Sequence, residues 1–96
     1  MPLNKEQKKH LRSLAHKLHP VVIIGQHGLT EPVLEELEPT LEHHELIKVR
    51  VNAGDRDERD AMIREMCERT GAELVQRIGH VAVLYRAARK PRIKLP

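Results

Sequence analysis

Residues 21–32 read VVIIGQHGLTEP and contain the main signals for the fold. Val21 to Ile24 is an unbroken β-branched run, which predicts a short strand buried on both faces. Gly25-Gln26-His27-Gly28 follows at once. Thr30 and Pro32 are typical of a helix start, because a proline in the first turn needs no hydrogen-bond donor. The stretch therefore predicts a strand, a Gly-x-x-Gly loop and a capped helix, in that order.

Apolar spacing and capping residues predict three helices. Residues 5–18 have the pattern of an amphipathic helix, with Asn4 as its cap. The helix after the loop contains Pro39, so we expect a kink or an early end there, because an interior proline removes one backbone hydrogen bond and costs roughly 3 kcal/mol. A third helix is predicted between Asp55, as its cap, and Gly71, which stops it.

Three further strands complete the pattern. Residues 47–51 alternate apolar and basic side chains, which predicts a strand with one solvated face. Residues 73–78 and 81–86 predict two more strands, joined by Gly79-His80 as a two-residue hairpin turn. The order α-β-α-β-α-β-β favours parallel pairing early and antiparallel pairing in the closing hairpin. The predicted fold class is α/β: a single compact domain with a four-stranded mixed sheet.

Charge divides the chain into regions of opposite sign. Residues 1–28 carry five lysines and arginines against one glutamate, whereas residues 29–47 carry six glutamates and neither lysine nor arginine. Residues 86–96 add five basic residues and no acidic one. We assign residues 1–86 to the domain and residues 87–96 to a basic tail that is extended or mobile. Basic ends and an acidic middle predict one surface that attracts a polyanion and another that repels it.

Composition excludes several classes of protein. Tyr85 is the only residue among Phe, Trp and Tyr, so the chain lacks the two or three rings with which RRM, OB and cold-shock surfaces hold unpaired bases. No apolar run approaches the roughly 18 residues that cross a bilayer, and the N-terminus lacks the apolar stretch of a signal peptide. Cys67, the single cysteine, cannot form an internal disulfide. We expect a cytoplasmic protein with no membrane partner, no cofactor and no metal.

The Gly-x-x-Gly loop is the candidate binding site. Gly25 and Gly28 carry no side chain, so a phosphate or sugar can come close to main-chain N–H groups. The helix after Thr30 is expected to add its first N–H groups and the positive end of its dipole. Gln26 and His27 at the tip can donate to a phosphate or a 2′-hydroxyl. A Gly-x-x-Gly turn alone is common, so its context carries the prediction.

Basic residues supply that context. They step by three or four positions along one face of the helix that leads into the strand before the loop, so we expect helix and loop to share an edge. Together they favour binding to the RNA backbone. The candidate RNA-binding residues are Gly25, Gln26, His27 and Gly28 in the loop, and Lys5, Lys8, Lys9 and Arg12 in the helix.

An enzyme and a protein-binding adaptor are the alternatives. The chain has seven histidines, but neither His16 nor His19 is joined by a nearby carboxylate at ligand spacing, and the adjacent His43 and His44 point in different directions. No nucleophile motif is present, because Ser13 is the only serine and Cys67 lies on an apolar stripe. Catalysis and a small-molecule substrate are therefore disfavoured. An adaptor would use the acidic segment to meet a basic partner such as a ribosomal protein. Copurifying material that ribonuclease removes would identify RNA as the main partner instead.

Two stretches resemble a known family. HLRSLAHKLHPVVIIGQHGLTEPVLEELEPTLEHHELIKVRV, residues 10–51, resembles the start of a CRM domain (chloroplast RNA splicing and ribosome maturation), and GHVAVLYR, residues 79–86, resembles its last strand. The nearest form is the small standalone bacterial, YhbY-like one. The resemblance implies a fold like the C-terminal domain of translation initiation factor three, and a Gly-x-x-Gly loop that contacts RNA. It also implies association with precursor large-subunit ribosomal RNA in pre-ribosomal particles. A KH domain fits less well, because its Gly-x-x-Gly loop lies between two helices.

Overall fold

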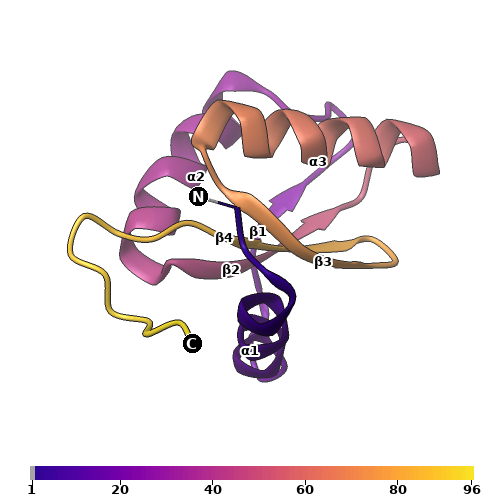
Figure 1. Cartoon of the computed structure of the whole chain (residues 1–96). Helices are drawn as coiled ribbons and strands as arrows, with labels where there is room; N and C mark the ends of the chain where they lie inside the picture. Colours follow the sequence, from indigo (N-terminus) through magenta and orange to yellow (C-terminus); the bar gives the residue numbers. More distant parts are fainter. Residues whose placement is uncertain (1) are drawn as a thin grey trace.

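A computed structural model describes residues 2–96, and the elements follow the predicted order (Figure 1). The helices are α1 (Lys5–Ala15), α2 (Glu31–His44) and α3 (Arg56–Thr70). The strands are β1 (Pro20–Ile24), β2 (Leu46–Val51), β3 (Glu73–Ile78) and β4 (Val81–Tyr85). Within residues 2–96, no helix is long and apolar enough to cross a membrane.

Reciprocal capping starts two of the helices. The Asn4 side chain accepts a hydrogen bond from the backbone N–H of Gln7 at 2.8 Å, and the Gln7 side chain accepts one from the Asn4 N–H at 3.1 Å. Asp55 begins α3 with the same type of pair. Helix α1 ends earlier than predicted, at Ala15, because the N–H of Leu18 turns back to the Ala15 carbonyl at 2.9 Å and redirects the chain toward β1.

Helix α2 continues through Pro39 to His44, so the early end considered from the sequence does not occur. Pro39 itself is exposed, whereas Leu37 and Leu41 on either side are fully buried. Burial of this leucine face outweighs the backbone hydrogen bond lost at proline. Thr30 occupies the predicted cap position, but its side chain makes no capping hydrogen bond.

The sheet has the strand order β1-β2-β4-β3. β1 and β2 are parallel, while β4 is antiparallel to both β2 and β3. This confirms the predicted single α/β domain with a four-stranded mixed sheet. Because β1 and β2 are parallel, the loops that follow them emerge at the same end of the sheet, and the β3–β4 turn lies there too.

Helices cover the two faces of the sheet unequally (Figure 1). α2 and α3 cover one face and bury the larger core, whose strand residues include Ile24, Val49 and Leu84. α1 packs on the other face against Leu46, Val75, Val83 and Tyr85, in a smaller core.

The prediction that β1 is buried on both faces is wrong. Val22 and Ile24 are buried under α2 and α3, but Val21 and Ile23 are 47% and 61% exposed. β1 is an edge strand, and α1 packs against β2, β3 and β4 instead. The continuous apolar run therefore has one solvated face.

The basic tail is tied to the domain by one buried glutamate. Glu45 ends α2 with φ 63° and is fully buried. Its carboxylate accepts hydrogen bonds from the backbone N–H groups of Ala88, Arg92 and Ile93 at 2.9, 3.0 and 3.0 Å. Burial raises the pKa of Glu45, but these three bonds and the charge of Arg92 outweigh it, so the pKa lies below its ordinary value. The tail has no helix or strand, yet it follows a defined path.

Candidate nucleic-acid interface

The Gly25–Gly28 loop is a tight turn at the end of β1. The N–H of Gly28 donates to the carbonyl of Gly25 at 3.0 Å. Gly28 has φ 72°, a left-handed conformation that favours glycine, and a Cβ there would meet Met62 of α3 at 3.6 Å. Gly25 differs, because within residues 2–96 no atom beyond its two chain neighbours would lie within 4 Å of a Cβ added to it. The fold thus requires glycine at 28, whereas the space beside Gly25 is open to a ligand.

The start of α2 follows the loop directly, with Thr30 as its cap, and the contribution of its first N–H groups to the loop stays a prediction. Glu31, the first residue of α2, forms an ion pair with Arg69 near the end of α3, at 2.9 Å. The start of α2 therefore lies against the end of α3. Gly28 packs on Met62, in the first half of α3, so α3 is the helix that supports the loop.

Three loops meet at the same end of the sheet, which we call the loop end: residues 25–30, residues 52–55 and the Gly79-His80 turn. The N–H of Asn52 donates to the carbonyl of Ile24 at 2.8 Å, and the N–H of Val51 donates to the carbonyl of His80 at 2.7 Å. Arg77 joins the turn to α3, because it donates to the Gly79 carbonyl at 2.9 Å and pairs with Asp60 at 2.9 Å. The loop end is thus a connected network. Gln26 and His27 are exposed on it.

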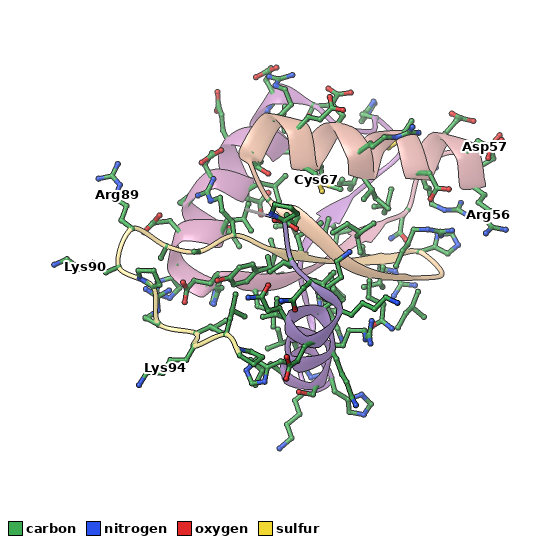
Figure 2. The ribbon with its side chains drawn as sticks, viewed as in Figure 1. Arg56, Asp57, Cys67, Arg89, Lys90 and Lys94 are labelled. Carbon is green, nitrogen blue, oxygen red and sulfur yellow. The ribbon has the colours of Figure 1, made fainter. Side chains whose placement is uncertain are left out.

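Arginines outside the predicted set surround this end. Arg50 is exposed on β2 and donates from Nε to the Asn52 side chain at 3.1 Å. Arg59 donates to the carbonyl of Gly54 at 2.9 Å. Arg56 projects from the first turn of α3, far from the tail residues Arg89, Lys90 and Lys94 (Figure 2). Two features of the sequence could have indicated these arginines. Arg50 is at a solvated position of the 47–51 strand, and Arg56 and Arg59 lie at the start of the third predicted helix.

The basic residues predicted on the first helix lie on α1, on the opposite face of the sheet from α2 and α3. Lys5, Lys9 and Arg12 are exposed, and Lys8 is half-buried. Lys8 lines an open cavity of about 620 Å³ with Asp60, Arg64 and Arg77 among others.

The flank of α1 that carries Lys8 and Arg12 is turned away from the tail. Gln7 reaches the tail, donating to the carbonyl of Pro96 at 3.3 Å. Lys8 instead shares its cavity with β3, which lines it from Glu73 at the start of the strand to Arg77 near its end. Arg12 follows Lys8 by four residues and lies on the same side of the helix. The expected shared edge of helix and loop is not formed, because Lys8 lies beside β3 and the Gly25–Gly28 loop follows β1, the strand at the opposite edge of the sheet.

Most of the acidic segment is engaged within the protein. Glu38 pairs with Arg86 at 2.7 Å, and Glu42 accepts the Arg89 N–H at 3.0 Å. Glu31 pairs with Arg69, and Glu45 accepts the backbone N–H groups of the tail. Among residues 2–96, this leaves Glu35 and Glu36 as the exposed carboxylates of the segment without an ion pair or hydrogen bond. The acidic segment therefore holds the tail and α3 in place more than it forms a free anionic face.

Cys67, the single cysteine, is half-buried and lies in surroundings that disfavour its thiolate form. Burial, then the charges of Glu73 and Glu68, raise the pKa of its thiol. A thiol with a raised pKa is less nucleophilic at neutral pH. Within residues 2–96, no group of three His, Cys, Asp or Glu side chains is placed to hold a metal ion.

Comparisons with known proteins find a family match and several similar chains. The family model of the CRS1/YhbY (CRM) domain matches residues 3–86. A Haemophilus influenzae protein named as an RNA-binding protein is 49% identical over 94 residues, covering 98% of this chain and 95% of the relative. A Pseudomonas aeruginosa protein named as a probable RNA-binding protein is 48% identical, covering 95% and 88%.

A solved structure is also similar. The solution structure of a Staphylococcus aureus protein for which RNA binding has been suggested superposes with a TM-score of 0.86 at 40% identity. The match covers 99% of this chain and 100% of that one.

Proposed function

The chain belongs to the CRS1/YhbY (CRM) domain family, and from this premise we propose that it is an RNA-binding protein that holds folded RNA by its sugar-phosphate backbone. One observation carries the proposal: the open space beside Gly25 lies at an end of the sheet surrounded by exposed arginines. A phosphate can reach the backbone of residues 25–28 there, and guanidinium groups can bind its neighbours. The relatives named as RNA-binding proteins support the same function.

The proposed site has two parts. Gly25, Gln26, His27 and Gly28 form one, and Lys5, Lys8, Lys9 and Arg12 on α1 form the other. The loop follows β1 and Lys8 lies beside β3, at the two edges of the sheet, so a folded RNA that contacts both parts spans the sheet. Because phosphate contacts are insensitive to sequence, selectivity then rests on the shape of the RNA.

We further propose that the target is precursor large-subunit ribosomal RNA in pre-ribosomal particles, in the cytoplasm, and that the protein is not an enzyme. Assembly intermediates present folded RNA that proteins do not yet cover. The adaptor alternative loses support because Glu31, Glu38, Glu42 and Glu45 are engaged within the chain.

The test is a double variant of the loop tip, Gln26→Asp with His27→Asp, measured by gel shift on a folded ribosomal RNA fragment. Two carboxylates facing phosphate should weaken binding by at least about tenfold, equal to about 1.4 kcal/mol. The matched control is Lys90→Gln with Lys94→Gln, which lowers the net charge by the same amount on the far side of the molecule (Figure 2). Equal affinity of the loop variant and the wild type, with unchanged circular dichroism, would refute the loop assignment.

A further inference from the structure

One row of side chains crosses the whole sheet at the loop end without being covered. The strand registers pair Ile23 with Arg50, Arg50 with Val81, and Val81 with Ile78. Paired residues point to the same face, so these four side chains form a single row on the α1 face. With strands about 4.8 Å apart, the row spans about 14 Å. We call it the open row.

The open row exposes the largest apolar surfaces of the sheet. Ile23 and Ile78 at its two ends are 61% and 62% exposed, and Arg50 between them is exposed. α1 does not reach the row, because it packs on Val83 and Val75, further from the loop end. Exposed apolar side chains that form one continuous row mark an interaction site more often than singly scattered ones do.

The row lies between the two parts of the proposed site. Ile23 is separated from the Gly25–Gly28 loop by Ile24 alone. Toward β3 lies the basic flank of α1, where Lys8 lines a cavity along that strand. An RNA strand that runs from the loop across the α1 face toward Lys8 has the open row in its path.

We propose that the open row binds the bases of unpaired nucleotides, with Ile23, Val81 and Ile78 contacting the base faces and the Arg50 guanidinium stacking on a base. The inference rests on the proposed RNA-binding function and adds single-stranded RNA, next to a folded region, to its target. Arg50 is suited to this role because a guanidinium plane stacks on bases in the way an aromatic ring does. Its Nε bond to Asn52 holds one edge of that plane.

A second copy of this chain is a poorer occupant. A two-fold contact centred on the row would bring Arg50 of one copy toward Arg50 of the other, and like charges oppose such a pairing. A few side chains also fall short of the about 800 Å² per partner that a stable protein interface buries. An anionic strand that carries apolar bases matches both the charge and the chemistry of the row.

The test compares two RNA probes with equal numbers of phosphates: a blunt hairpin, and a shorter hairpin carrying an unpaired 3′ extension. The wild type should bind the extended probe more tightly by at least about fivefold, because the extension adds base contacts while the number of phosphates stays equal. Ile23→Thr with Ile78→Thr should abolish this preference and leave the affinity for the blunt hairpin unchanged. Leu74→Thr is the matched control, because Leu74 is an exposed strand residue on the opposite face.

Two further measurements separate base contact from charge and from folding. Arg50→Lys keeps the positive charge but removes the planar guanidinium group. It should therefore reduce the preference for the extended probe and preserve the salt dependence of RNA affinity. In methyl spectra of the wild type, the extended probe should shift the δ1 methyl signals of Ile23 and Ile78 upfield through the ring currents of the bases. The signals of Ile24 and Ile47, buried on the opposite face, should stay in place.

The outcomes are distinct. Equal binding of both probes by the wild type, or a preference that the double threonine variant keeps, would overturn the inference and leave the proposed function standing. Binding of neither probe would overturn both. A wild-type dimer that the double threonine variant dissolves, seen by analytical ultracentrifugation, would show that a second copy covers the row instead.

Discussion

The carboxylate of Glu45 accepts the backbone N–H of Ala88 at 2.9 Å, across 43 positions of sequence. Glu45 is also the residue that ends α2 in a left-handed conformation, with φ 63°. A single side chain therefore joins the turn between α2 and β2 to the C-terminal tail. The other two bonds of this carboxylate, from Arg92 and Ile93, hold the tail where Ile93 and Leu95 pack against the smaller core.

Replacing Glu45 by Gln should release the tail and destabilise the protein. The amide offers an N–H₂ group where backbone N–H donors need an acceptor, so at least one buried donor is left unpaired. We expect a loss of about 1–3 kcal/mol in the free energy of unfolding. Urea denaturation measures the loss, and hydrogen exchange should show reduced protection at Ala88 and Ile93. Glu36→Gln, at an exposed position of α2, is the control and should change neither.

The contribution of Glu45 should also depend on pH. Its pKa in the folded protein is lowered, so its stabilising effect is present above the unfolded carboxyl pKa of about 4.3 and is lost as the pH falls through the folded value. The difference in unfolding free energy between the wild type and Glu45→Gln should therefore be constant near neutrality and narrow in acid. Parallel curves down to the acid transition would contradict this assignment.

The two loop glycines should respond differently to alanine. Gly28→Ala forces a Cβ into the left-handed region and should cost about 1–2 kcal/mol of stability. Gly25→Ala should leave stability unchanged or raise it by about 0.4–1 kcal/mol, because the position has open space and no positive φ. If RNA approaches the backbone here, Gly25→Ala should nevertheless weaken RNA binding. Thermal melts and fluorescence anisotropy separate the two effects, and full affinity in Gly25→Ala would argue against close approach.

Neutralising Lys5, Lys8, Lys9 and Arg12 to Gln should lower affinity for many RNA sequences alike. Each lost phosphate contact should reduce the slope of log K against log salt by about 0.7–0.9. Glu35→Gln with Glu36→Gln is the control, because these carboxylates are exposed and leave the tail and α3 contacts intact. Glu42 is unsuitable as a control, since it accepts the N–H of Arg89. A slope that stays constant in the quadruple variant would show that α1 faces away from RNA.

In cell lysate, the protein should sediment with particles slightly lighter than the mature large ribosomal subunit. This association should occur at low salt and disappear at high salt, because phosphate contacts carry it. Western blotting across a sucrose gradient is the measurement. Recovery only at the top of the gradient, or only with small subunits or polysomes, would contradict the ribosomal assignment and leave general RNA binding intact.

The sequence by itself determined the order of the elements and the reciprocal caps of two helices. Asn4 and Asp55 predict the starts of α1 and α3 through reciprocal capping. The alternation of apolar and basic side chains in residues 47–51 predicts β2. These signals are local, because a cap or a strand period involves residues only two to four positions apart. The parallel pairing of β1 with β2 also followed, from the helix that lies between them.

Only the tertiary structure decided three features that depend on long-range contacts: the continuation of α2 through Pro39, the exposed face of β1 and the row of four side chains across the sheet. Pro39 stays within α2 because the leucines beside it are buried, and no local rule weighs that burial against a lost hydrogen bond. Val21 and Ile23 are exposed because β1 is an edge strand that α1 does not cover. The apolar run alone predicts burial on both faces, and only the position of β1 in the sheet shows that one face is solvated. Ile23, Arg50, Val81 and Ile78 lie on four strands, and only the strand registers bring them into one row.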